Sequence, residues 1–134
     1  MIEASGLSIT QTQLDEADSA LGEMLGGSKA SSVILINSDD GSLIRVKGSA
    51  DELDTVSLAA LAAGAFVSTQ EIARQIGEPE FTMLFHQGRT HHVHVNVAGE
   101  HCLLMTLFDD ETTVGMVRLC ARKACLRIKH AFDT

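Results

Sequence analysis

The sequence predicts an α+β domain in which three helices and five antiparallel strands follow one another in the order α-β-β-α-β-β-β-α. Two continuous aliphatic runs, SVILIN at 32–37 and CLLMTLF at 102–108, indicate central strands that are buried on both faces. Three longer segments repeat apolar residues at three- and four-residue steps, as amphipathic helices do. A chain of 134 residues that is 45% hydrophobic fits one such unit, so we expect 1–134 to form a single domain.

The chain up to residue 48 predicts a helix followed by a β-hairpin. Residues 1–8 show little periodicity, and we expect them to fray. Ser8 and Gln11 form an S-x-x-Q capping box, with Thr10 or Thr12 as competing caps, and the glycine pair at 26–27 is expected to close the helix. After the strand at 32–37, the turn SDDG leads into a second strand at 43–47, where apolar and basic residues alternate. This alternation places the second strand nearer the edge of the sheet.

The next helix, expected from Asp54 or Thr55 to a stop at Gly77 and Pro79, has two distinct rows of side chains. One row is apolar and is expected to face the core: Leu58, Leu61, Ala65, Ile72 and Ile76. The other row holds small residues four apart: Ala60, Gly64 and Ser68. Small side chains at this spacing let another backbone come close, which could offset the roughly 0.5–1 kcal/mol that a mid-helix glycine costs. The small row therefore either packs under the protein's own sheet or contacts a partner.

Three strands and a helix complete the predicted fold. The strands are expected at 81–86, 93–97 and 102–108, and in the middle one valines alternate with His92, His94 and Asn96. That pattern predicts one solvent-exposed face, which would carry both histidines. The last helix begins near Thr112 or Thr113, runs to about Phe132 and is basic; a solvated face and a contact with a partner or an anion both explain its charge.

Composition and charge favour a protein partner. A formal net charge of -8 argues against a general binder of nucleic acid or of anionic membranes. Three cysteines without a CxxC pair indicate neither a disulfide framework nor a zinc ribbon. The N-terminus has no basic signal region, and we expect no apolar run to reach the roughly 18–20 residues of a membrane span. We therefore expect a cytoplasmic protein.

A histidine cluster is the only metal-like feature, and no catalytic constellation stands out. The cluster comprises His86, His91, His92, His94 and His101. No cysteine or carboxylate stands at a standard zinc-ligand spacing beside it, so a metal-binding protein is the weaker alternative of a different class. There is no G-x-S-x-G, P-loop or G-x-G-x-x-G pattern, and we expect neither a catalytic residue nor a cofactor.

Four motifs resemble the roadblock/dynein light-chain family, in particular bacterial MglB-type regulators of Ras-like GTPases. They are D-x-x-S-L-A-x-L-x-A-G at 54–64, I-G-E-x-E-F at 76–81, F-H-x-G at 85–88 and F-D-x-x-T-x-x-G-x-V-R at 108–118. The resemblance covers about residues 30 to 130. It implies the profilin-like roadblock fold, with strands in the spatial order 2-1-5-4-3, the first and third helices on one face and the second on the other.

The resemblance also implies two interaction surfaces. A homodimer would join through the third strand and second helix, which maps onto Phe81, Thr82, Met83, Leu84, Phe85 and His86. The second helix would bind a Ras-like small GTPase of the MglA type through Ala60, Gly64, Ser68, Glu71 and Gln75. Some family members stimulate GTP hydrolysis without inserting an arginine, and many are adaptors without that activity. A scaffold of a larger complex is therefore the runner-up.

Overall fold

A five-stranded antiparallel sheet forms the centre of the computed structural model, which describes residues 2–4, 7–49 and 52–133. The strand order is β4-β3-β7-β6-β5, which is the predicted order. The strands are β3 (Ser32–Asn37), β4 (Leu43–Gly48), β5 (Met83–Gln87), β6 (His91–Val97) and β7 (Cys102–Asp109). The two aliphatic runs, β3 and β7, pair in the middle, because only strands covered on both faces can be apolar throughout.

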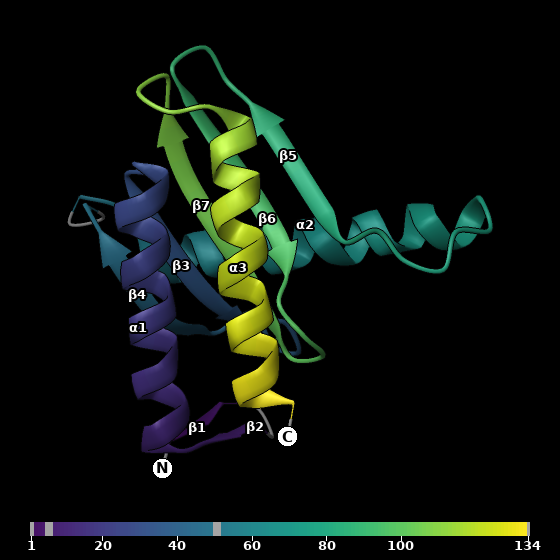
Figure 1. The fold of residues 1–134 in the computed structure, drawn as a ribbon. Helices are drawn as coiled ribbons and strands as arrows, with labels where there is room; N and C mark the ends of the chain where they lie inside the picture. The colour runs from purple at the N-terminus through teal and green to yellow at the C-terminus, as the bar shows by residue number, and fades with distance from the viewer. Residues whose placement is uncertain (1, 5–6, 50–51, 134) are drawn as a thin grey trace.

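Helices cover both faces of the sheet. Figure 1 shows α1 (Gln11–Ser28) and α3 (Val114–Phe132) side by side on one face and α2 (Thr55–Gln75) crossing the other. Each face has its own apolar cluster: Leu35, Leu104 and Phe108 pack under α1 and α3, while Ile34, Ile36 and Met105 pack under α2. One half of α2 projects well beyond β5, so part of this helix lies outside the layer that it covers (Figure 1).

The N-terminal region differs from the fraying expected for residues 1–8. The strands β1 (Ile2–Ala4) and β2 (Leu7–Ile9) pair antiparallel, with Ile2 opposite Ile9. Ile9 is buried in the core under α1 and α3. The sequence of this short segment did not indicate that burial. Residues 1, 5 and 6 lie outside the described part of the chain.

The first helix begins at the competing cap, Thr10, instead of Ser8. The Thr10 hydroxyl accepts a hydrogen bond from the Gln13 amide, and the Gln13 side chain accepts one from the Thr10 amide, which makes the reciprocal capping box. The helix continues through both glycines to Ser28 and ends at Lys29 in the left-handed region, with φ of 59°. A Cβ on Gly27 would lie 3.5 Å from Cys120 Sγ, so this glycine permits close packing on α3 instead of ending the helix.

The prediction that one face of β6 is exposed to solvent is wrong, because α3 covers that face. His92 and His94 are buried on the α1–α3 side, while Val93, Val95 and Val97 pack toward α2. His92 Nδ1 accepts a hydrogen bond from the Gly88 amide at 3.1 Å, and its Nε2 lies 2.9 Å from Asp110. His94 is fully buried beside Phe85, and within the described ranges neither of its ring nitrogens has a hydrogen-bond partner.

Candidate interaction surface

The helix α2 buries mainly alanines and exposes most of its large aliphatic side chains. Asp54 caps it by accepting hydrogen bonds from the amide and hydroxyl of Ser57, and Gly77, with φ of 79°, follows its C-terminal end. Its buried residues are Ala59, Ala62, Ala63, Phe66 and Ala73, and all but Ala73 belong to the apolar cluster on this face of the sheet.

The prediction that Leu61, Ile72 and Ile76 face the core is therefore wrong. Leu61, Ile72 and Ile76 are 70%, 57% and 68% exposed. The physical reason is the close approach of the helix to the sheet and its turns. A Cβ on Gly41, in the β3–β4 turn, would lie only 3.3 Å from the Ala60 Cα, so little space remains for long side chains beneath α2.

The small-residue row predicted as a docking surface points away from the sheet. Ala60, Gly64, Ser68, Glu71 and Gln75 are all exposed. At 100° per residue they lie on the side of the helix opposite the buried alanines. A Cβ on Gly64 would meet nothing within 4 Å. Packing under the protein's own sheet is thus excluded as the reason for Gly64 and Ser68, whereas Ala60 also lies close to Gly41 of the β3–β4 turn.

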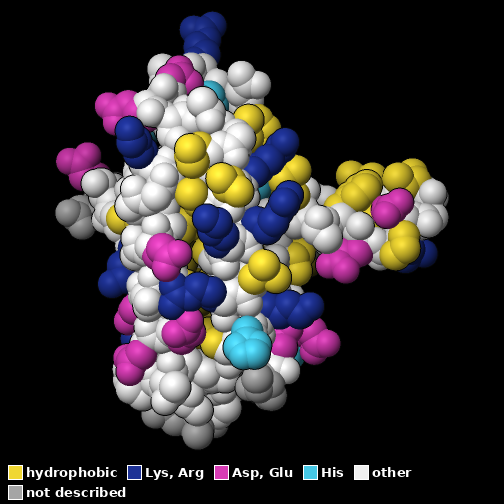
Figure 2. Space-filling view, in the orientation of Figure 1, with side chains coloured by type: hydrophobic (Ala, Val, Ile, Leu, Met, Phe, Trp, Pro, Cys, Tyr) yellow, Lys and Arg dark blue, Asp and Glu magenta, His cyan; other side chains and the backbone are white. Residues whose placement is uncertain are grey.

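Large apolar side chains flank this row on both sides. Among the described residues, six of the ten exposed large hydrophobic residues lie on α2 or next to its ends: Leu53, Val56, Leu61, Val67, Ile72 and Ile76. Figure 2 shows hydrophobic side chains gathered on the projecting part of the molecule. Covering the exposed parts of such side chains is worth on the order of 1 kcal/mol or more each. Exposed apolar side chains gathered in this way are typical of interaction sites.

The polar groups of the row are held in place by one another. Glu71 accepts hydrogen bonds from the Arg74 guanidinium and from the Gln75 side-chain amide. This guanidinium, and secondarily Gln75, lowers the pKa of the Glu71 carboxyl below its usual value. Glu71 therefore stays ionised, with its charge paired to Arg74 on the same helix.

The same helix corrects the expectation that no segment has the length and hydropathy of a membrane span. The 21-residue helix α2 is long and apolar enough to cross a membrane by length and composition alone, since an 18-residue stretch of it has a mean hydropathy of 1.4. Its alanines nevertheless pack on the sheet, where they form part of the core.

The predicted dimer residues lie at a free sheet edge. β5 starts at Met83, two residues later than predicted, and its only strand neighbour in the described part of the chain is β6. Thr82, Met83 and His86 are exposed, Phe81 and Leu84 are half-buried, and Phe85 stacks on Phe108 with ring centroids 6.1 Å apart. Phe85 is thus held by the protein's own core, whereas most of the other predicted residues are accessible.

A glutamine that sequence reasoning missed ties this edge to α2. The Gln70 side chain donates to the Phe81 carbonyl at 2.6 Å and accepts from the Phe81 amide at 3.0 Å. The backbone of Phe81 thus makes the same pair of hydrogen bonds that it would make with a neighbouring β-strand. This holds the segment just before β5 against α2. No local sequence signal could have found this pair, because the contact depends on how residues 76–82 turn back along α2.

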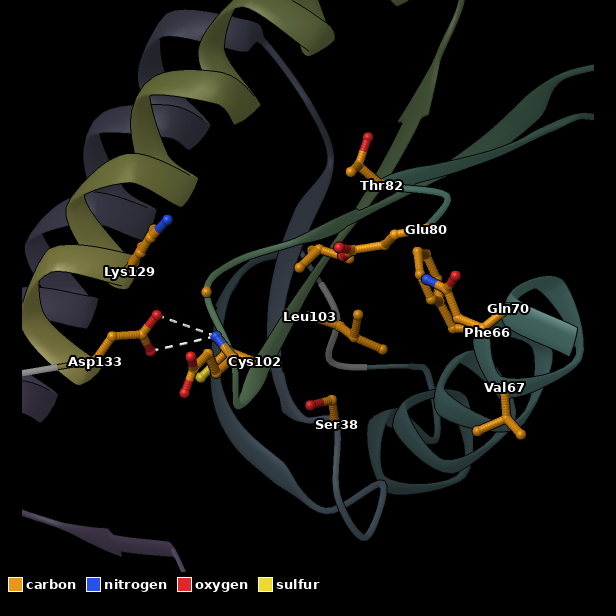
Figure 3. A pocket seen from close by; sticks show the side chains of 13 residues that line it. Ser38, Phe66, Val67, Gln70, Glu80, Thr82, Cys102, Leu103, Lys129 and Asp133 are labelled. Atoms are coloured by element: carbon orange, nitrogen blue, oxygen red, sulfur yellow. Dashed lines mark hydrogen bonds between the residues drawn. The ribbon is translucent and has the colours of Figure 1, made fainter. Parts of the chain in front are cut away.

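A hollow of about 750 Å³ lies between the projecting half of α2 and the β6–β7 turn (Figure 3). Val67 and Gln70 line it from α2, and Asp133 lines it from the end of α3. Asp133 accepts hydrogen bonds from the Glu100 amide, which holds the turn (Figure 3). Burial, together with Asp133, raises the pKa of the Cys102 thiol to about 12, so this cysteine stays protonated and is no nucleophile.

The histidine cluster disperses in the structure. His92 and His94 are buried, while His101 faces Asp39 at the opposite end of the sheet, 3.3 Å away. Over residues 2–4, 7–49 and 52–133, no three histidine, cysteine or acidic side chains group as metal ligands.

This architecture, a five-stranded antiparallel sheet with two helices on one face and one on the other, is that of a profilin-like roadblock domain. A family model described as the Roadblock/LC7 domain matches residues 20–108, and the chain belongs to that family. No match is found among curated proteins.

Solved structures of MglB are similar over nearly the whole chain. A gliding protein MglB from Thermus thermophilus superposes with a TM-score of 0.89 at 29% identity, covering 98% of each chain. Myxococcus xanthus MglB superposes with a TM-score of 0.87 at 29% identity, covering 95% of each chain. Profilin II from Acanthamoeba castellanii, at 13% identity and a TM-score of 0.59 over 85% of this chain and 94% of that one, shows the shared profilin-like fold alone.

Proposed function

We propose that this chain is a homodimeric regulator that binds a Ras-like small GTPase, of the MglA type, through the outer face of α2. The observation that carries the proposal is the inverted arrangement of α2, which buries alanines and exposes Leu61, Val67 and Ile72. A helix that turns its large apolar side chains outward gains stability only when something covers them. Membership of the roadblock family and the similarity to MglB structures support a GTPase as that partner.

The homodimer is proposed from the edge strand and the projecting helix together. β5 has one free edge, which natural sheets either cover or pair. A second copy paired along β5 would bring its own sheet close to the projecting half of α2. One similar structure, 28% identical with a TM-score of 0.89, is described as MglB with a tetrameric arrangement, and association of copies therefore occurs in that protein.

We further propose that the regulator binds the GTP-bound form and stimulates its hydrolysis without supplying a catalytic group. Binding energy alone can shift the GTPase switch regions, provided that the dimer binds one state more tightly than the other. Arg74, the basic residue in the last turn of α2, is paired with Glu71 on its own helix, which argues against its use as an inserted arginine.

The test is a pull-down from native cell extract with GTP or GDP analogues, followed by single-turnover hydrolysis on the recovered GTPase. We expect a small GTPase to be retained with the GTP analogue and its hydrolysis to accelerate when the protein is added. If the GTPase is retained equally with both nucleotide analogues and its rate of GTP hydrolysis is unchanged, the scaffold function is favoured. Recovery of no GTPase under either condition would refute the proposal.

A further inference from the structure

A second groove lies on the face of the sheet opposite α2, between α3 and the strands β5 and β6. It has a volume of about 450 Å³. Three basic side chains from α3 line one wall, and residues of β5, of β6 and of the segment just before β5 line the other: Arg118, Arg122, Lys129, Thr82, Met83 and Asn96. Figure 2 shows Lys and Arg side chains gathered over α3, beside hydrophobic ones.

The three cations of the groove have no carboxylate partner among the described residues. Within those ranges, no acidic oxygen lies within 4.0 Å of Arg118, Arg122 or Lys129. The other side of α3 behaves differently, because Arg127 forms ion pairs with Glu16 and Glu23 of α1. One side of this helix is thus neutralised by the protein itself, and the groove side keeps its charge.

Apolar side chains border the cations. Leu126, also on the groove wall, is 63% exposed, and Leu119 and Met83 are exposed as well. The groove therefore combines positive charge with apolar surface, which suits a ligand that carries carboxylates and apolar side chains together.

The length of the positively charged stretch on α3 favours a short peptide over a nucleic acid or a membrane. From Arg118 to Lys129 is eleven helical positions, or about 16 Å, which about five or six residues of extended peptide span. A nucleic acid or a membrane would extend beyond this stretch onto a protein whose formal net charge is -8, where repulsion opposes binding. A short acidic segment avoids that repulsion.

We propose that the groove between α3 and β5–β6 binds a short acidic segment with apolar side chains from a partner protein. The carboxylates pair with Arg118, Arg122 and Lys129, and the apolar side chains cover Leu126. Because the groove and the outer face of α2 lie on opposite faces of the sheet, this segment and a GTPase bind at the same time. In the homodimer proposed above, the two grooves flank the β5–β5 seam.

The test uses a fluorescein-labelled dodecapeptide of repeated Asp-Glu-Leu and the full chain, with fluorescence anisotropy as the readout. We expect binding that weakens as salt rises and that is lost when Asn and Gln replace the acidic residues. The double variant Arg118→Gln/Arg122→Gln should bind the peptide about tenfold or more weakly, since it removes two charge-assisted contacts. When the peptide is titrated into the protein, the backbone amide NMR signals that shift most should belong to residues of α3 and β5.

The matched control is Lys29→Gln/Arg89→Gln, which removes the same charge from two exposed sites outside the groove. It should bind the peptide within about twofold of the parent protein. An equal loss in both double variants, no peptide binding, or tighter binding of phosphatidylserine vesicles or duplex DNA than of the peptide would overturn the proposal. No GTPase is present in this experiment, so its failure is separate from failure of the proposed function.

Discussion

Gly64→Arg is the sharpest perturbation of the proposed docking surface. A Cβ at this position meets nothing within 4 Å, so the side chain has room on the isolated protein. Replacing a mid-helix glycine by arginine should raise the free energy of unfolding by about 0.5–1 kcal/mol. In the complex, a long charged side chain would enter a close contact between two surfaces. We expect a loss of about 2–3 kcal/mol in binding, or about 30- to 150-fold in Kd, when the GTP-loaded GTPase is titrated calorimetrically.

The matched control is Gly22→Arg in α1. Gly22 is also exposed and within a helix, and a Cβ there also meets nothing within 4 Å, but it lies on the other face of the sheet. Both variants should melt at or above the temperature of the parent protein, and only Gly64→Arg should lose the GTPase. Unchanged binding and dimerisation in Gly64→Arg would refute the assignment of this surface.

Three further predictions concern the supporting structure. Gln70→Ala removes both hydrogen bonds to Phe81 and should cost about 1–3 kcal/mol in chemical denaturation; unchanged amide exchange at Phe81 would contradict this. Arg127→Lys removes the guanidinium that bonds the Glu16 carboxylate on α1, and it should lower the free energy of unfolding by about 1 kcal/mol or less, because the pair is partly exposed. A decrease above about 3 kcal/mol would show a different role. Burial lowers the pKa of His94 below 6.5, so the unfolded chain takes up a proton more readily, and stability should fall as pH drops below about 6.5. The variant His94→Leu should flatten that decline in urea denaturation between about pH 5 and 7, and a parallel decline would contradict it.

The order of the strands could be predicted because the strongest sequence signals come from burial on both faces. The runs at 32–37 and 102–108 have no polar face, and they form the two central strands. The starts of the second and third helices were predicted to within one residue, and Asp54 and Thr113 act as their N-caps, since short polar side chains satisfy helix amides locally.

The face of α2 that meets the sheet could not be predicted, for a physical reason. Alanines and larger aliphatic residues both recur at helical spacing on this helix, and periodicity cannot decide between them. The choice depends on how closely the helix approaches the sheet, which is set by contacts such as that between Gly41 and Ala60. The same limit applies to His94, whose alternation with valines resembles that of a strand with one face in solvent until α3 covers it.

The central claim is that the outer face of α2 binds the GTPase. The most direct measurement is hydrogen–deuterium exchange of this protein alone and with the GTPase loaded with a GTP analogue. We predict added protection along α2, from Ala60 to Gln75, together with unchanged exchange in α1. Protection confined to α1 or α3, with none on α2, would contradict the claim.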